Sequence, residues 1–272
     1  MSRLPLPADW LVPDWPAPPG VRAVCTTRSC PAGDAPSAAP WGGFNLADHV
    51  GDAPQAVASH RAALAACTGA RPVFLKQMHG CHVAELDAYA PDGQPADAAV
   101  TASSGVACTV MVADCLPVLL ARADGAAVAA AHAGWRGLAG GVIEAAAQAV
   151  RRLGPHPPAS AASATSAVEV VAWLGPCIGP DAFEVGPEVR AAFTAARPEA
   201  AACFTPRPGG KWLAHLPALA RQRLAALGIP AWGNDGSPAW CTFSQPQLFH
   251  SYRARPVTGR MAACVWMAQG ES

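Results

Sequence analysis

The 272 residues include 19 Lys and Arg and 19 Asp and Glu, so the formal net charge at pH 7 is zero. A balanced chain lacks the basic field that holds nucleic-acid backbones, and no apolar run reaches the roughly 20 residues of a membrane span, which argues against both kinds of partner. The proline-rich residues 1–20 contain no apolar signal-peptide core, and we therefore expect a cytoplasmic protein.

Apolar runs typical of strands alternate with helical patterns from residue 21 onwards. The expected strands cover residues 21–26, 72–76, 107–112, 116–121, 126–132, 168–174 and 261–267. The expected helices cover residues 52–67, 138–153, 188–196 and 216–227. This alternation predicts an α/β fold: a single compact domain, residues 21–268, with a mixed β-sheet core flanked by helices and preceded by the segment 1–20.

Two local signals refine this outline. Asp52 precedes Pro54 at the start of the first helical pattern, where a carboxylate can cap a helix and proline is tolerated. The low-complexity stretch 154–167 is typical of a surface loop, and we expect it to lie within the domain because the apolar run after it reads as a core strand.

Ten cysteines are scattered along the chain and include no C-x-x-C pair. In a reducing compartment such cysteines are mostly small buried apolar residues, with one reactive or metal-bound member as the exception.

Polar side chains follow or end three of the apolar runs, and each segment supplies one soft or borderline metal ligand. These are His79 in residues 75–80, Cys115 in residues 112–117 and His132 in residues 130–137. Two imidazoles and a thiolate suit zinc, and three protein ligands leave the fourth position open. No short metal-binding spacing joins the three, so each one alone also reads as an ordinary buried residue.

The context of His132 strengthens its case. The strand leads directly into Gly134-Trp135-Arg136, where glycine permits a close backbone approach and a helix begins. Such a turn can bind an anion, with Arg136 as reinforcement. Trp135 could stack on a base or pack beneath the helix.

Six blocks of this sequence together resemble the bacterial laccase-domain family, which is variously named polyphenol oxidase, multifunctional purine nucleoside phosphorylase and peptidoglycan editing factor. The blocks are FNLADHVGD (44–52), KQMHG (76–80), ADCLPVLL (113–120), AAHAGWRG (130–137), LGPCIGPDAFEVG (174–186) and HSYRARPVTGRMA (250–262). The resemblance runs in order from about residue 20 to residue 267.

The resemblance implies one metal held by His79, Cys115 and His132, with a purine nucleoside pocket beside it. Plausible pocket residues in the matching blocks are Asn45, Gln77, Arg136, Arg253 and Arg260. Arg28 could reach a phosphate, although the family's Gly-Gly-x-Ser turn is absent after it. The expected partners are purine nucleosides and phosphate, and the expected state is a monomer.

The implied reaction is zinc-dependent phosphorolysis of adenosine and inosine, with methylthioadenosine as a further candidate substrate. Adenosine deaminase activity is the second implied reaction, since zinc lowers the pKa of bound water to about 7. A multicopper laccase needs many imidazoles, and the eight histidines here include no His-x-His pair. A single Cu²⁺ in the same site could still oxidise phenols weakly.

Two other classes use the same residues. In a cysteine hydrolase that edits peptidoglycan precursors, Cys115 would be the nucleophile and His79 or His132 its base. A purely structural zinc site would need a fourth protein ligand. The nearest candidates by motif are His49, Cys81, His82 and Asp114.

Overall fold

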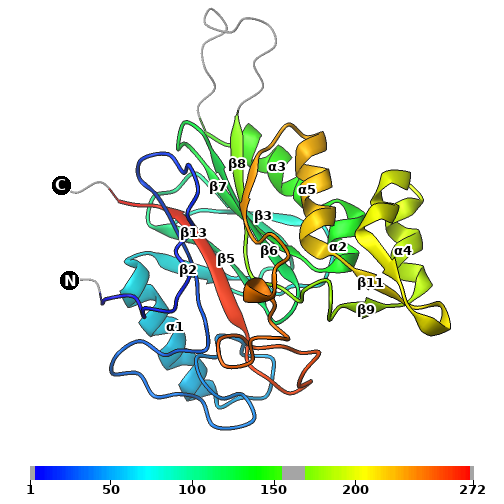
Figure 1. Ribbon diagram of the computed structural model, residues 1–272. Coiled ribbons are helices and arrows are strands. Elements are labelled where there is room, and N and C mark those ends of the chain that lie inside the picture. The colour runs from blue at the N-terminus through cyan, green and yellow to red at the C-terminus, as the bar shows by residue number, and fades with distance from the viewer. Residues whose placement is uncertain (1–3, 155–168, 270–272) are drawn as a thin grey trace, which may run out of the picture.

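Two β-sheets stacked face to face form the centre of the fold (Figure 1). The computed structural model describes residues 4–154 and 169–269, so all of the predicted loop 154–167 except Gly154 lies outside the described residues. The first sheet has the order β1 (Val21–Cys25), β13 (Met261–Met267), β5 (Val106–Val112), β2 (Arg71–Phe74). The second has the order β12 (Ala231–Gly233), β8 (Val170–Leu174), β6 (Leu116–Arg122), β7 (Val128–Ala133), β4 (Ala98–Thr101), β3 (Val83–Leu86).

Both sheets are mixed. In the first, β2 and β5 run parallel while β13 is antiparallel to its two neighbours. In the second, the edge pairs β3 with β4 and β8 with β12 are parallel, and the central strands are antiparallel. The predicted α/β fold with a mixed sheet core is therefore confirmed.

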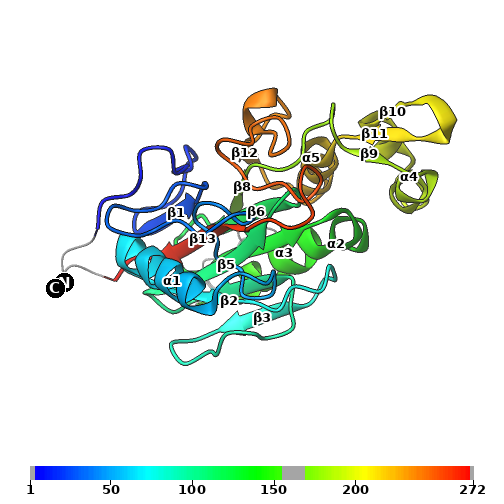
Figure 2. The ribbon, with the colours of Figure 1, turned by 90° about the horizontal axis from the view of Figure 1, so that it is seen from below.

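Alternate side chains of each strand enter different apolar layers. In β5, Cys108 and Val110 face the second sheet, whereas Met111 belongs to the layer under α1 (Pro54–Thr68). The outer face of the second sheet packs against α3 (Val142–Arg152) and α5 (Leu216–Ala226). Helices thus cover both outer faces (Figure 2), and strands buried on both sides read as the continuous apolar runs seen in the sequence.

A smaller lobe extends from the side of the second sheet (yellow in Figures 1 and 2). It contains a three-stranded sheet of β9 (Glu184–Val185), β11 (Trp212–Ala214) and β10 (Phe204–Pro206), together with α4 (Pro187–Thr194). Three short 3₁₀ helices complete the described elements: η1 (Pro198–Cys203), η2 (Pro208–Gly210) and η3 (Pro238–Trp240). The lobe's apolar side chains join the same core layer as α3 and α5, which fixes it to the second sheet.

The predicted helix over residues 138–153 is wrong in one respect. The chain is already helical in α2 (Trp135–Gly140), and a break at Gly141 then separates α2 from α3. Gly141 has φ 102°, a left-handed conformation that glycine adopts without the steric penalty of a side chain. The earlier start matters because it places Trp135 and Arg136 in the first turn of a helix.

The cap predicted from Asp52 is also wrong. The cap residue of α1 is Ala53, and Asp52 is instead buried, where it accepts hydrogen bonds from Ser37 and Asn45. All ten cysteines are free thiols. None of the helices in the described ranges is long and apolar enough to span a membrane.

Candidate metal centre and nucleoside pocket

The fold brings His79, Cys115 and His132 together. One ligand atom from each lies within 4.8 Å of the others, and Cys115 Sγ is 3.9 Å from His79 Nε2. The pairing of β6 with β7 is responsible for part of this arrangement, because Leu116 pairs with Ala133 and so sets Cys115 beside the end of the His132 strand.

Left-handed turns direct two of these three side chains. His79 has φ 60°, and Asp114, just before Cys115, has φ 97°. Residues with a side chain rarely adopt this region, so the surrounding structure must hold it. Asp114 is held by its carboxylate, which accepts hydrogen bonds from Thr242 Oγ1 at 2.6 Å and from the backbone N–H of Arg253 at 2.7 Å.

Asp97 holds the other turn. Its buried carboxylate accepts hydrogen bonds from the backbone N–H groups of Met78, His79 and Gly80 at 2.7–3.0 Å. Its Oδ1 also lies 2.9 Å from His132 Nδ1. A carboxylate can only accept at this position, so Nδ1 carries the proton and Nε2 is left for a metal, an arrangement common to histidine metal ligands.

The pKa of Asp97 is lower than its ordinary value. Burial opposes the ionised form, but the hydrogen bonds from His132 and from the backbone of Gly80 and Met78 favour it more strongly. The carboxylate is therefore negatively charged when it orients His132.

We expect Asp97→Asn to weaken metal binding about 10- to 100-fold, the usual effect of losing a carboxylate partner of a histidine ligand. The amide can accept from the backbone on one side only and presents no charge to His132. Zinc affinity measured by competition with a chelator checks this. Asp87→Asn is the matched control, since Asp87 is exposed and its carboxylate accepts a hydrogen bond from the nearby backbone N–H of Tyr89; equal affinities in both variants would contradict the assigned role.

Without a metal, Cys115 and His132 form an ion pair. Burial opposes ionisation of the thiol, yet the charge of His132 and hydrogen bonds from both imidazoles lower the pKa of Cys115 to about 6. Burial likewise disfavours the imidazolium, but the Cys115 thiolate and the Asp97 hydrogen bond raise the pKa of His132 to about 9. A thiolate already present at neutral pH is the form that binds metals.

Alkylation of the metal-free protein should therefore select Cys115. The reactive thiolate is present above its pKa, so labelling by iodoacetamide should be half-maximal at about pH 6. Cys30 and Cys81 are also partly exposed, but burial raises the pKa of each thiol, and both should stay largely unlabelled at pH 7. Mass-spectrometric mapping over pH 5–9 checks this, and a Cys115 profile centred near pH 9 would refute it.

The residues present fit a soft or borderline metal. One thiolate and two imidazoles suit zinc or copper better than magnesium or calcium, which prefer oxygen ligands. Gly134 allows the three side chains to meet: a Cβ there would lie 2.9 Å from Cys115 Sγ and 3.0 Å from His79 Cδ2. Within the described ranges, His79, Cys115 and His132 are the one group that could hold a metal, and the four candidates for a structural fourth ligand are not part of it.

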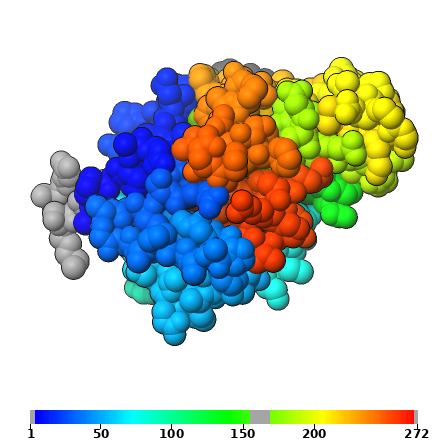
Figure 3. Space-filling model, turned by 60° about the horizontal axis from the view of Figure 1, so that its bottom comes forward, coloured from blue at the N-terminus to red at the C-terminus, as the bar shows by residue number. Residues whose placement is uncertain are grey.

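The three side chains line a cavity of about 440 Å³, a size typical of small-molecule sites. The apolar part of its wall comes from Trp135 and from residues near the lobe, Ile178, Phe183 and Leu216. The C-terminal segment contributes Tyr252, Arg253 and Arg260. Figure 3 shows this segment, coloured orange to red, between the N-terminal part of the chain and the yellow lobe.

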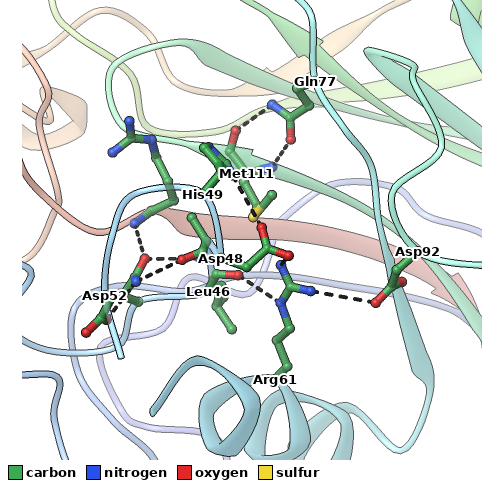
Figure 4. Close-up of polar contacts among 11 residues, drawn as sticks. Leu46, Asp48, His49, Asp52, Arg61, Gln77, Asp92 and Met111 are labelled. Carbon is green, nitrogen blue, oxygen red and sulfur yellow. Dashed lines mark hydrogen bonds and ion pairs between the residues drawn. The ribbon is translucent and has the colours of Figure 1, made fainter. Parts of the chain in front are cut away.

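Four of the predicted substrate residues line this cavity: Gln77, Arg136, Arg253 and Arg260. The Gln77 amide is fixed by Met111, whose backbone carbonyl accepts from Nε2 at 2.8 Å and whose N–H donates to Oε1 at 2.7 Å (Figure 4). The Arg136 guanidinium lies 4.4 Å from the centre of the Trp135 ring. The Arg253 guanidinium donates to the carbonyl of Glu184 in the lobe.

Arg28 and Asn45, in contrast, are not among the residues that line the cavity. Arg28 donates to the carbonyls of Gly42 and Pro246. Asn45 is fully buried, and its Oδ1 accepts the backbone N–H of Arg260 at 2.9 Å. Both residues therefore hold loops around the pocket.

Comparisons with known proteins match nearly the whole chain. A family model described as multi-copper polyphenol oxidoreductase laccase matches residues 22–268. A relative named purine nucleoside phosphorylase PA4543, from Pseudomonas aeruginosa, is 46% identical over 95% of this chain and 98% of its own length. Purine nucleoside phosphorylase YfiH of Escherichia coli (strain K12) is 42% identical over 94% of this chain and 98% of its own.

Solved structures agree with the sequence comparisons. The crystal structure of Neisseria meningitidis protein NMB0706 superposes with a TM-score of 0.82 at 42% identity, covering 96% of this chain and all of that one. YlmD from Geobacillus stearothermophilus gives a TM-score of 0.80 at 25% identity, covering 99% of this chain and all of that one.

Proposed function

This chain belongs to the laccase-like family described as multi-copper polyphenol oxidoreductases, and we propose that, within this family, it is a metal-dependent purine nucleoside phosphorylase. Its relatives at 46% and 42% identity carry that name over almost their full lengths. The observation that carries the proposal is that one cavity is lined both by the metal-ligand group of His79, Cys115 and His132 and by three arginines, Arg136, Arg253 and Arg260.

The family's description as multicopper oxidases finds little support in these residues. A multicopper site couples four ions through many imidazoles, whereas the described residues form one ligand group with two histidines. Phosphorolysis of a nucleoside needs cationic side chains to bind phosphate and aromatic side chains to pack against the base, and the pocket contains both.

Each wall has a part in the proposed reaction. Arg136, Arg253 and Arg260 would bind phosphate and hold one of its oxygens toward ribose C1′. The Trp135 and Phe183 rings would pack against the purine. Zinc held by His79, Cys115 and His132 would supply Lewis-acid polarisation of the bound nucleoside.

Adenosine deamination is a second proposed activity of the same pocket. The supporting observation is the ligand count, because three protein ligands leave a coordination position for water. Copper in the same group would make weak phenol oxidation a side reaction of metal substitution rather than the function. We further propose residues 21–268 as the catalytic domain, preceded by the proline-rich N-terminal segment 1–20, of which Trp10 and Leu11 pack against that domain.

Product analysis tests these assignments. We expect inosine with phosphate to give ribose 1-phosphate and hypoxanthine, with no conversion when phosphate is left out. Adenosine should give ribose 1-phosphate with phosphate and inosine without it. No product from either nucleoside would refute the proposal and favour the alternative in which Cys115 acts as a hydrolase nucleophile.

A further inference from the structure

His49 lines the same cavity as the metal-ligand group without belonging to it. We propose that His49 is a catalytic residue, the general acid that protonates the departing purine, and that Asp48 positions it. This assignment rests on the proposed phosphorolysis. Three observations support it: the place of His49 in the cavity, its carboxylate partner, and the packed arginine that contacts that partner. A chemical argument adds that the arginines of the pocket cannot supply the proton.

The His49 imidazole is exposed at the cavity, and one of its two ring nitrogens lies beside the Asp48 carboxylate. The His49 side chain is 60% exposed, and its Nδ1 lies 3.5 Å from Asp48 Oδ1 (Figure 4). With Nδ1 beside a carboxylate, Nε2 is the ring nitrogen available to a substrate.

Asp48 is held by Arg61 of α1, which also contacts the loop between β3 and β4. Arg61 Nη2 lies 3.3 Å from Asp48 Oδ2, and Arg61 Nη1 lies 3.7 Å from Asp92. Arg61 Nε donates to the carbonyl of Leu46 at 2.9 Å, and its guanidinium lies 4.0 Å from the centre of the Phe74 ring. Figure 4 shows Arg61 between the two carboxylates. Arg61 is only 19% exposed, so the cation that contacts the exposed Asp48 carboxylate is itself well packed.

The loop that carries His49 is also tied to the C-terminal wall of the pocket. Leu46 N–H donates to the carbonyl of Arg260 at 3.2 Å, and Asn45 Oδ1 accepts from Arg260 N–H. These bonds fix His49 relative to an arginine that would bind phosphate. Exposed ion pairs contribute little to stability, so loop stability alone gives no reason for an exposed Asp48–His49 pair at the cavity.

Phosphorolysis requires a proton on the departing purine. A bond forms between a phosphate oxygen and ribose C1′ while the C1′–N9 bond breaks and its electron pair passes to the purine. The proton on His49 Nε2 passes to a purine nitrogen, and the imidazole regains a proton from the hydrogen phosphate that has reacted. The arginines of the pocket remain protonated throughout and cannot serve as this acid, whereas imidazole is the side chain most often used for it.

The test compares two leaving groups in zinc-loaded protein. Hypoxanthine leaving inosine needs a proton, whereas the already cationic base of 7-methylinosine departs as a neutral molecule without one. We expect His49→Gln to lower kcat for inosine about 100-fold or more, the usual contribution of a general acid, and to change kcat for 7-methylinosine by less than about threefold. Asp48→Asn should reduce the inosine rate alone, by a smaller factor.

His82→Gln is the matched control, since His82 is an exposed histidine outside the cavity lining and should leave both rates unchanged. Equal losses for both substrates, or no loss in His49→Gln, would overturn the assignment of His49 while leaving phosphorolysis intact. A wild-type protein that cleaves neither nucleoside in the presence of phosphate would overturn both proposals. Zinc content should equal that of the wild type in every variant, and loss of zinc from His49→Gln would instead make His49 a ligand and overturn its role as acid.

Discussion

His132→Ala should abolish metal binding and lower phosphorolysis about 1000-fold or more, because it removes a ligand that the rest of the site is built to orient. A bound metal contributes several kcal/mol to a reaction of this kind, and each 1.4 kcal/mol is a factor of ten. His132 is 3% exposed near the C-terminal end of β7, where it pairs with Pro117 of β6. No other described residue belongs to the ligand group and could replace it.

The protein should stay folded. The substitution removes one hydrogen bond from buried Asp97, which keeps its three backbone donors, so the expected loss of stability is about 1–3 kcal/mol. Elemental analysis, circular dichroism and product formation from inosine together check the prediction. His82→Ala serves as control. Inosine phosphorolysis at the wild-type rate in His132→Ala would show that the metal-ligand group is not required for the reaction.

Gly134→Ala should give the second-largest effect, through geometry alone. The backbone of Gly134 has φ −62° and ψ 157°, which any residue can adopt. The added Cβ would, however, lie 2.9 Å from Cys115 Sγ, closer than real Cβ contacts, and 3.0 Å from His79 Cδ2, tighter than nine in ten of them. The Cys115 sulfur would have to move and the His79 ring to give way slightly. A misplacement of about 1 Å in an active site can cost about 100-fold in rate, which is the upper end of the expected loss.

This variant separates ligand geometry from ligand identity, since all three ligands are still present. We expect metal affinity and turnover to fall together while the thermal unfolding of the metal-free protein changes little, because the side chains that must move lie at the cavity. Chelator competition and inosine turnover measure the two quantities. Wild-type affinity in Gly134→Ala would mean that the metal does not sit between Cys115 and His79.

The layered fold follows from patterns that sequence displays directly. Every predicted strand is present, because strands buried on both faces are continuous apolar runs, as β5 and β13 show. Six short strands are missed: β3, β4, β9, β10, β11 and β12. Each has four residues or fewer and gives no clear periodic signal, whereas β2, equally short, belongs to a longer apolar run. The break at Gly141 is missed because one glycine within a helical pattern is compatible with either a continuous or an interrupted helix.

The sequence indicated the metal-ligand group in two ways: each ligand follows or ends an apolar run, and the resemblance to the laccase-domain family implied that the three residues hold one metal. Its supporting residues gave no such signal. Asp97 acts across 35 residues on His132 and across 18 on His79, and only the pairing of β4 with β7 makes that possible. Asn45 and Arg28 lie in motifs that suggested substrate contact, but neither lines the cavity; Asn45 bonds Asp52 and the backbone of Arg260, and Arg28 bonds the carbonyl of Pro246.

The central claim is that one metal in the His79, Cys115 and His132 group makes this pocket a phosphorolytic site. Its most direct test is to titrate zinc into chelated protein while phosphate-dependent release of hypoxanthine from inosine is measured. The account predicts no activity at the start and a linear rise that ends at one zinc per chain. Full activity in the metal-free protein would contradict it.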